Sequence, residues 1–295
     1  MNSSSAGSLI QINLDDLVAS FGWENRPLLA RLLRRIFIAP AVKFAHQMAE
    51  FDSAVGERGL VEGSRLALRK YFDDIRLFGA DLIPDSAFLA LSNHPGMSDT
   101  LSTFVALNRP DLQIIASKRP FLEALRNVSR QLFYVTEDPA SRMALIRRVS
   151  MHLRSGGAVL TYPAGRIEPD PDLHDDAVDS LGSWTDSVGA FLRLAPETAI
   201  LPVLVRGVVW DKAAYHPLTY IKRTREEREK LAAALQLFAH MMLNVKAVAV
   251  RVQIGKPIHA KELGTIETQV IHRAVLNEMR RLIEKPPEGE GIQLL

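Results

Sequence analysis

The chain has 295 residues, of which 47% are hydrophobic, so it can bury the core of one large domain or of two smaller ones. Basic and acidic residues nearly balance, at 36 against 34, so the chain has no overall field that would attract nucleic acid. The lack of cysteine excludes a disulfide framework, a thiolate nucleophile and cysteine-ligated zinc. Catalysis would therefore depend on His, Ser, Asp, Glu, Lys or Tyr side chains.

The first residues of the chain lack the basic start and the unbroken apolar core of a secretory signal, which predicts a cytoplasmic protein. No apolar run reaches the ~18 residues that a membrane-spanning helix requires. If the protein contacts a membrane, we expect it to lie on the surface.

Segment 26–49 predicts an amphipathic helix with five basic residues and no acidic one. Its apolar face comprises Leu29, Leu32, Leu33 and Ile36, and its arginines Arg31, Arg34 and Arg35 lie largely opposite. Pro40 is expected to break or bend the helix. This composition is typical of a helix that lies in a membrane interface. The alternative is a surface helix that packs on its own domain and exposes a solvated basic face.

Short apolar runs alternate with helical patterns from residue 71 onward. Runs that are rich in β-branched or aromatic residues predict strands at 72–79, 86–93, 112–118, 132–136, 157–163, 199–207 and 248–255. Helices are predicted at 98–107, 120–131, 140–154, 183–194, 225–245 and 266–285. The repeated alternation predicts an α/β fold with a mixed, largely buried sheet that is flanked by helices.

These patterns divide the chain into an N-terminal helical region at 1–69, an α/β domain at 70–283 and a flexible tail at 284–295. Segment 167–180 carries six carboxylates and two prolines, which predicts an exposed loop. Its Asp172, His174, Asp175 and Asp176 could be imagined as metal ligands. Because metal ligands need a rigid frame, we expect a solvated loop and no metal site.

The run LSNHPGMSDT, residues 91–100, places His94 at the exit of a predicted strand, where open α/β sheets expose functional loops. The Pro-Gly pair that follows predicts a sharp turn, with Ser98 as a helix cap and Asp99 in the first helical turn. A carboxylate on one imidazole nitrogen fixes the tautomer, and the other nitrogen can then take a proton from a hydroxyl or from water. The pair is a candidate general base; a turn histidine beside a helix-terminal aspartate is the alternative.

Four segments, in order, resemble the glycerolipid acyltransferase family, which includes lysophospholipid and glycerol-phosphate acyltransferases. Residues 93–99 resemble its Asn-His-x4-Asp signature, and GAVLTYPAGRIE, residues 157–168, is similar to its Phe-Pro-Glu-Gly-Thr-Arg block. AILPVLVRGV, residues 199–208, and VRVQIGKPI, residues 250–258, are similar to its buried Pro-Val strand and its closing strand. Together the segments cover about residues 70–260.

This resemblance implies that His94 deprotonates a hydroxyl of a lyso-lipid or of glycerol phosphate and that Asp99 orients His94. The oxygen would attack the thioester of acyl-coenzyme A or acyl carrier protein, with no covalent acyl-enzyme, no metal and no cofactor. Backbone amides near Gly165 are candidates for stabilising the oxyanion. Ser98 as a nucleophile is the rival role.

The family's second block usually carries a glutamate, where this chain has Ala164, and the family's arginine after the fourth predicted strand is replaced by Thr136, Glu137 and Asp138. The acidic pair would repel a phosphate. Either Arg166, Lys118 and Arg119 bind the phosphate instead, or the acceptor is not glycerol phosphate. The candidate substrate-binding residues are Asn93, Lys118, Arg119, Tyr162, Pro163, Gly165 and Arg166.

The sequence thus predicts an O-acyltransferase that acts on a membrane lipid acceptor, with coenzyme A and acyl carrier protein both open as carriers. Segment 26–48 would hold it on the inner face of the cell membrane as a peripheral protein. One alternative is an esterase or thioesterase, although the chain has no Gly-x-Ser-x-Gly elbow. Another is a catalytically silent lipid-binding relative, which retention of His94 and Asp99 argues against.

Overall fold

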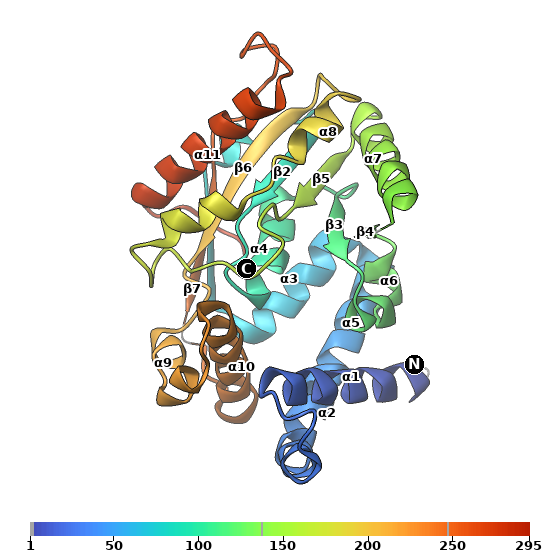
Figure 1. Ribbon diagram of the computed structural model, residues 1–295, viewed down its shortest axis with the longest axis vertical. Coiled ribbons are helices and arrows are strands. Elements are labelled where there is room, and N and C mark those ends of the chain that lie inside the picture. Colours follow the sequence, from blue (N-terminus) through green and yellow to red (C-terminus); the bar gives the residue numbers. More distant parts are fainter. Residues whose placement is uncertain (1–2, 137, 247) are drawn as a thin grey trace.

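The computed structural model describes residues 3–136, 138–246 and 248–295, and within them an eight-stranded sheet is covered by helices on both faces (Figure 1). The strands are β1 Asp74–Phe78, β2 Phe88–Ser92, β3 Gln113–Ser117, β4 Leu132–Val135, β5 Ala158–Thr161, β6 Ala199–Arg206, β7 Ala249–Ile254 and β8 Ile292–Gln293. Their order across the sheet is β4-β3-β5-β2-β6-β7-β1-β8. The mixed α/β fold is confirmed, as is each of the seven predicted strands, with the ends moved by a few residues.

Five neighbouring strands, β4, β3, β5, β2 and β6, run parallel. β7 is antiparallel to β6 and parallel to β1, and β8 closes the sheet antiparallel to β1. Because the five parallel strands end at the same edge, the loops that follow β2, β3 and β5 lie near one another.

The longer helices are α1 Ser3–Ser20, α2 Pro27–Arg58, α3 Leu60–Tyr71, α4 Met97–Leu107, α7 Pro139–Arg154, α10 Arg225–Leu243 and α11 Thr268–Glu284. The shorter ones are η1 Ala80–Leu82, α5 Pro120–Ala124, α6 Arg126–Ser129, η2 Ala177–Ser183, α8 Val188–Leu192, α9 Asp211–Ala214 and η3 Pro217–Ile221. The predicted helix 120–131 is split because Leu125 leaves the helical region, at φ −88° and ψ 84°. Pro40 lies inside α2, which continues past it. No described helix is both long and apolar enough to cross a bilayer.

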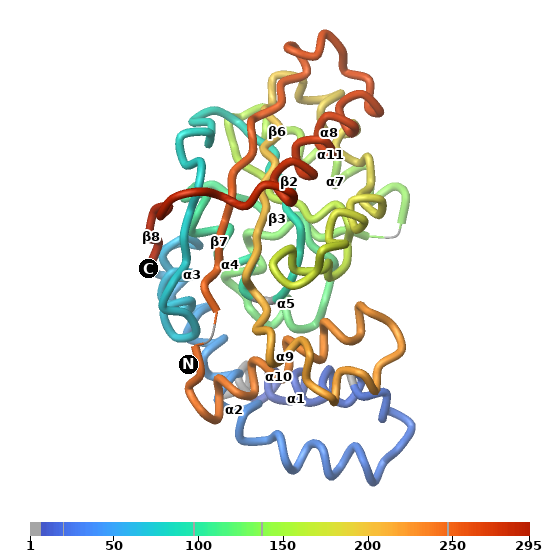
Figure 2. The backbone as a smooth tube through the Cα atoms, turned by 90° about the vertical axis from the view of Figure 1, so that its left-hand side faces the viewer, coloured from blue at the N-terminus to red at the C-terminus, as the bar shows by residue number. Residues whose placement is uncertain are grey.

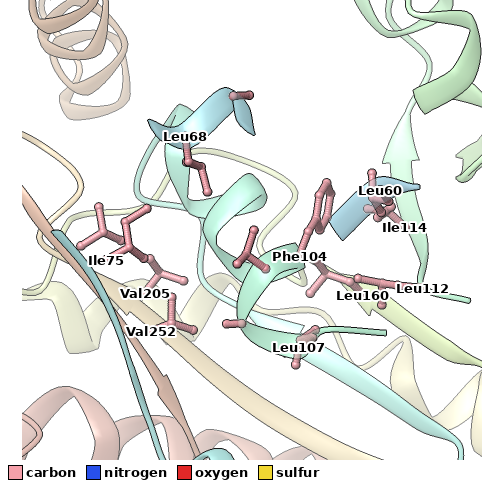
Figure 3. Close-up of a cluster of buried hydrophobic side chains, with 14 of the residues drawn as sticks. Leu60, Leu68, Ile75, Phe104, Leu107, Leu112, Ile114, Leu160, Val205 and Val252 are labelled. Carbon is pink, nitrogen blue, oxygen red and sulfur yellow. The ribbon is translucent and has the colours of Figure 1, made fainter. Parts of the chain in front are cut away.

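Alternate residues of the central strand β2 face two different hydrophobic clusters. Phe88 and Ala90 belong to the cluster beneath α2, α3 and α4, whereas Leu89 and Leu91 belong to the one beneath α7, α8 and α11. Figure 3 shows part of the first cluster, in which Phe104 of α4 lies among side chains from the sheet and from α3. Burial on both faces explains why β2 reads as a continuous apolar run in the sequence.

The N-terminal helices share the first cluster with the sheet. Phe44 and Phe51 of α2 belong to it together with Ile75 of β1. Asp52 of α2 also accepts the backbone N–H groups of Asn127 and Val128 at the start of α6, at 2.8 and 2.9 Å. The second half of α2 is therefore packed against the α/β part of the chain, whereas its first half carries several exposed apolar side chains.

The C-terminal segment differs from the expected flexible tail. Gln293 pairs with Arg76 and Ile292 with Leu77, and the Leu294 N–H donates to the Ile75 carbonyl at 2.9 Å. β1 would otherwise present a row of unpaired backbone groups at the edge of the sheet, and β8 covers it.

Candidate active site

His94 follows β2 directly, and the turn after it returns the imidazole to Asp99 in the first turn of α4. His94 Nδ1 lies 2.8 Å from Asp99 Oδ2, and Asp99 is fully buried. The same carboxylate oxygen accepts the Gly96 N–H at 2.9 Å. The His94 side chain remains 28% exposed, so its ring is within reach of a bound molecule. With Nδ1 on the carboxylate, Nε2 is the nitrogen that can take a proton.

The environment of His94 makes it a stronger base. Burial on its own lowers the pKa of His94, but the charge and the hydrogen bond of Asp99 outweigh this effect, and the net pKa is raised above its usual value. The Glu168 carboxylate raises the pKa further, while the Arg119 charge lowers it. A base with a raised pKa accepts a proton more readily once it is deprotonated.

A chain of hydroxyl groups holds the other oxygen of Asp99. The Thr100 hydroxyl donates to Asp99 Oδ1 at 2.9 Å, and the Tyr162 hydroxyl donates to Thr100 Oγ1 at 2.9 Å. The Tyr162 ring lies 4.7 Å from the His94 ring, centroid to centroid. Burial raises the pKa of Tyr162 well above its usual value, so its hydroxyl stays protonated and donates. The structure thus brings Tyr162, a predicted site residue, beside the His94–Asp99 pair.

A second carboxylate, that of Glu168, holds the main chain of His94. Glu168 is 1% exposed, and its Oε2 accepts the His94 N–H at 3.1 Å. Its Oε1 accepts the Trp184 indole N–H at 2.7 Å and the Ser180 hydroxyl at 3.1 Å. The Glu168 N–H in turn donates to the His94 carbonyl at 2.9 Å. Burial raises the pKa of Glu168 to about 7, although these hydrogen bonds and His94 lower it.

The expectation that segment 167–180 is an exposed loop is wrong for two of its acids, Glu168 and Asp170. Asp170 is 0% exposed, and burial raises its pKa. Its carboxylate accepts three successive backbone N–H groups after β6, those of Gly207 at 2.9 Å, Val208 at 2.6 Å and Val209 at 3.1 Å. Those amides have left the sheet, and Asp170 supplies the acceptors that buried N–H groups require.

The four residues considered as metal ligands do not converge. Asp172 forms ion pairs with Arg206 and Arg251, and Asp176 forms one with Arg225. His174 Nε2 lies 3.0 Å from Glu229 Oε1. Across the described residues, no group of three or more acids and histidines could hold a metal ion. These contacts instead attach the acidic segment to β6, β7 and α10.

Three of the predicted substrate-binding residues have structural roles, because their polar groups form hydrogen bonds within the protein. Asn93 exchanges two hydrogen bonds with the Val205 backbone, both at 2.8 Å, and so joins the end of β2 to β6. Pro163 is buried, and its carbonyl accepts the Thr185 N–H at 3.2 Å. Gly165 is exposed with a left-handed φ of 64°, and its N–H donates to the Tyr162 carbonyl at 3.0 Å. Gly165 therefore supplies the turn after β5.

The three predicted phosphate-binding cations differ in their surroundings. Lys118 is exposed and pairs with Glu123 at 3.1 Å. Arg119 is also exposed, and its charge acts on His94, since it lowers the pKa of that residue. Arg166 is exposed on the loop after β5. Arg119 is thus the cation that the structure connects electrostatically to the candidate base.

The acidic positions that depart from the family pattern lie at the start of α7. Asp138 caps this helix by accepting the Ser141 N–H at 2.8 Å, and that contact lowers its pKa. Glu137 lies outside the described residues. At least one of the two carboxylates therefore has a structural role at a helix N-terminus.

Ser98 is not the helix cap that the sequence predicts, because α4 begins at Met97 and Ser98 lies within it. Its hydroxyl is buried and has no hydrogen-bond partner among the described residues. His94 instead bonds to Asp99. This arrangement gives Ser98 no activated proton acceptor, as a nucleophile would require.

No protein-family model matches this chain, and no curated protein matches it either. Among solved structures, it is similar to the crystal structure of the 1-acyl-sn-glycerophosphate acyltransferase from Thermotoga maritima. The two share 16% sequence identity with a TM-score of 0.43, over 96% of this chain and 98% of that one.

Proposed function

We propose that this protein is an O-acyltransferase that moves a fatty acyl group from a thioester to a hydroxyl of a lipid acceptor. The observation that carries the proposal is the His94 imidazole, held through Nδ1 by the buried Asp99 at the carboxyl edge of a parallel sheet. That pair lies in a run resembling the glycerolipid acyltransferase signature, and Tyr162 of the second resembling segment contacts it.

In the proposed reaction, the acceptor hydroxyl gives its proton to His94 Nε2 while its oxygen attacks the thioester carbonyl carbon. The tetrahedral intermediate then collapses, the carbon–sulfur bond breaks, and the imidazolium returns the proton to the leaving thiolate. Asp99 fixes the tautomer of His94 and stabilises the imidazolium, which is the role of the carboxylate in other His-Asp pairs. An ester and a free thiol are the products.

The oxyanion of that intermediate needs N–H donors close to His94. The loop after β5 is adjacent, because β5 pairs directly with β2. Since the Gly165 N–H already donates to Tyr162, the neighbouring amides of Ala164 and Arg166 are the proposed donors. The reaction needs no cofactor beyond the acyl thioester.

The acceptor is proposed to be a lyso-phospholipid, glycerol phosphate or a related lipid. Arg119 acts on His94 electrostatically, and Arg166 lies on the loop beside it. A guanidinium binds a phosphate in bidentate fashion, which would place an adjacent hydroxyl at the base.

The exposed face of α2 is proposed to hold the enzyme on the inner face of the cell membrane as a peripheral cytoplasmic protein. Leu28, Leu32 and Ile36 are 76%, 55% and 55% exposed, whereas Leu33, predicted on the same face, is buried. Leucines bordered by arginines suit the headgroup region of an anionic leaflet. Leu32→Glu combined with Ile36→Glu should abolish co-sedimentation with anionic vesicles while leaving the fold intact. Unchanged sedimentation would contradict this placement.

The test of the proposed function is release of free thiol from palmitoyl-coenzyme A and from palmitoyl-acyl carrier protein, comparing wild type with His94→Ala. Each donor is offered with lyso-phospholipid vesicles, with glycerol phosphate or with no acceptor. We expect release that needs an acceptor and is lost in the variant. Release without an acceptor would indicate a thioesterase, and no release from either donor would contradict the proposal.

A further inference from the structure

A pocket of about 290 Å³ lies beside the end of the acidic segment, between that segment, η3 and the first turns of α10. None of the residues that line it belongs to the site around His94. Its volume is several times that of one water molecule, which is about 30 Å³ in the liquid, so it can hold a small organic group. The side chains that give the pocket its chemistry are His174, Tyr215, Tyr220, Arg225, Arg228 and Glu229.

Two buried atoms of this lining have no hydrogen-bond partner among the described residues. They are Oε2 of Glu229, whose side chain is 5% exposed, and Nη2 of Arg225. The two side chains are neighbours, since Arg225 Nε lies 3.5 Å from Glu229 Oε1. A buried carboxylate oxygen needs a donor, and a buried guanidinium N–H needs an acceptor. A bound group that offers both would satisfy the pair.

Arg228 brings a second guanidinium group to the pocket. Its Nε donates to the Lys222 carbonyl at 3.0 Å, and its guanidinium carbon lies 5.4 Å from the centre of the Tyr220 ring. These contacts fix the side chain, and a guanidinium can bind a phosphate through two parallel N–H groups. Together Arg225, Arg228 and Glu229 offer partners to an anion and to a cation at the same time.

Two tyrosine rings complete the lining. The Tyr215 hydroxyl donates to the Leu173 carbonyl at 2.8 Å, which holds its ring against the acidic segment. The face of a tyrosine ring attracts an ammonium group. A simple anion would be repelled by the Glu229 carboxylate. A ligand whose phosphate binds the arginines and whose ammonium group binds Glu229 and the rings therefore matches the pocket better than phosphate alone.

The surroundings of the pocket favour a membrane lipid as the source of this group. Residues 212–225, here called the η3 segment, contain four Lys or Arg residues and no Asp or Glu. Leu218 and Ile221 of this segment are exposed, Ile221 to 72%. Tyrosines, apolar side chains and cations together are typical of a segment at the headgroup level of a membrane.

The η3 segment also lies at the end of the molecule where α2 exposes its leucines. Figures 1 and 2 both place α9 and α10, which flank the segment, at the same end as α2. α10 packs on α2 through Phe238 and Phe37, whose ring centroids lie 5.0 Å apart. A bilayer that contacts the exposed leucines of α2 can therefore contact the η3 segment as well.

We propose that this pocket binds the phosphate–ammonium headgroup of a zwitterionic membrane lipid, such as phosphatidylethanolamine, and that the lipid anchors the η3 segment to the bilayer. The phosphate binds Arg225 and Arg228, and the ammonium group binds Glu229. Leu218 and Ile221 enter the bilayer beside the bound lipid. This lipid is an anchor and not the acyl acceptor, so the inference does not depend on the proposed acyl transfer.

The first test measures binding of O-phosphoethanolamine, inorganic phosphate and ethanolamine to the whole chain by calorimetry. Phosphoethanolamine should bind about tenfold more tightly than either fragment, because it satisfies both charges. Glu229→Gln should reduce its affinity to that of phosphate, whereas Arg228→Gln should weaken the binding of phosphate and phosphoethanolamine alike.

The matched control is Glu226→Gln, which removes a carboxylate of the same helix that pairs with Lys230 and does not line the pocket. It should bind all three compounds as wild type does, and circular dichroism confirms the fold of each variant. A wild type that binds phosphate and phosphoethanolamine equally, or binds neither, would overturn the inference. A preference that survives in Glu229→Gln would do the same.

Vesicles distinguish a lipid from a soluble source of the same group. We hold phosphatidylglycerol at a fixed fraction and supply the remainder as phosphatidylethanolamine or as an uncharged galactolipid. Wild type should sediment more with the phosphatidylethanolamine vesicles, and Glu229→Gln should lose that gain while it still binds both kinds of vesicle through α2. Binding of soluble phosphoethanolamine without any gain on vesicles would overturn the lipid anchor. Neither measurement needs turnover, so a failure here would leave the proposed function in place.

Discussion

The turn at residues 93–100 and the acidic segment at 167–180 both hold His94, but they do so over different distances along the chain. In the turn, the carboxylate that binds the imidazole is five residues away. In the acidic segment, the Glu168 carboxylate reaches the His94 N–H across 74 residues, and Asp170 reaches the amides after β6 across 37 or more. Two residues that contact each other within one turn can be recognised in the sequence by their spacing. Two residues that are far apart in the chain cannot, and the sequence then shows only that the segment is rich in acids.

The two carboxylates also act on different parts of His94. Asp99 binds the ring, so it determines the tautomer and the charge of the base. Glu168 binds the main chain on either side of the residue through its carboxylate and its N–H, so it determines where the turn lies. We therefore expect Asp99 to govern the chemical step and the acidic segment to govern the placement of the turn and the pH at which it functions.

Replacing Asp99 is expected to have the largest effect on activity. Asp99→Asn keeps an amide oxygen for the Gly96 N–H and for His94 Nδ1 but removes the charge that raises the pKa of His94 and stabilises the imidazolium, so kcat should fall by about 10²- to 10⁴-fold. Acyl transfer measured at saturating donor checks this, with circular dichroism to confirm the fold. His94→Ala should lose a similar amount, and the double variant should be no worse than either, because the pair acts as a unit. Near-normal turnover in Asp99→Asn would favour the alternative of a structural turn histidine.

Removing Asp170 should have the next largest effect, on stability. Asp170→Ala leaves the amides of Gly207, Val208 and Val209 without their acceptor, and we expect the free energy of unfolding to fall by about 3 kcal/mol. Urea titration measures it. The matched control is Asp175→Ala in the same segment, where the side chain is exposed and the change should stay within about 0.5 kcal/mol. Equal stabilities of the two variants would mean that the segment is the solvated loop that its composition suggests.

The sequence was sufficient for the parts of the fold and site that local patterns determine. The parallel strands were predicted because both of their faces are buried, which makes each a short run of β-branched and aromatic residues. The contact between His94 and Asp99 was predicted from the strand end and the turn residues around them, whereas Tyr162 was a candidate only because segment 157–168 resembles the family's second block. β8 was not predicted, because Ile292 and Gln293 are exposed and their strand depends on pairing with β1.

Glu168 was missed for the same physical reason as β8. Acids beside prolines are usually solvated, and only the three-dimensional structure shows that Trp184 and Ser180 close over this one. A local clue exists, since Glu168 ends the segment that resembles the family's second block, three residues after Gly165. Side-chain burial of a single acid cannot be inferred from the average character of its neighbours.

Glu168→Gln should have a moderate effect and should move the pH profile. An amide can still serve Trp184 and Ser180 through its oxygen, but its NH₂ group then faces the His94 N–H, so we expect kcat/KM to fall about tenfold from a misplaced turn. Activity rises with pH as His94 loses its proton. Because the Glu168 charge raises the pKa of His94, its removal should shift this rise to lower pH.

The control for that experiment is Asp179→Asn, which removes an exposed carboxylate of the same segment and leaves Glu168 with all its hydrogen bonds. The pH profile of this variant should match that of wild type. If Glu168→Gln shows an unshifted profile, the acidic segment acts on His94 through position alone.

The smallest expected effect is that of Thr100→Val, which keeps the shape of the side chain and removes the hydroxyl between Tyr162 and Asp99. Asp99 Oδ1 loses one donor, while its Oδ2 keeps His94 and Gly96. Because the lost hydroxyl acts on His94 only through Asp99, kcat should fall only about fivefold. Tyr162→Phe, which leaves Thr100 donating to Asp99, should cost no more than this. If Asp99 governs the chemical step and Glu168 governs the placement of the turn, the loss of kcat/KM should be largest for Asp99→Asn, smaller for Glu168→Gln and smallest for Thr100→Val. A Thr100→Val loss as large as that of Asp99→Asn would mean that the Asp99 carboxylate depends on the hydroxyls of Thr100 and Tyr162. The turn at residues 93–100 would then not be sufficient to position His94.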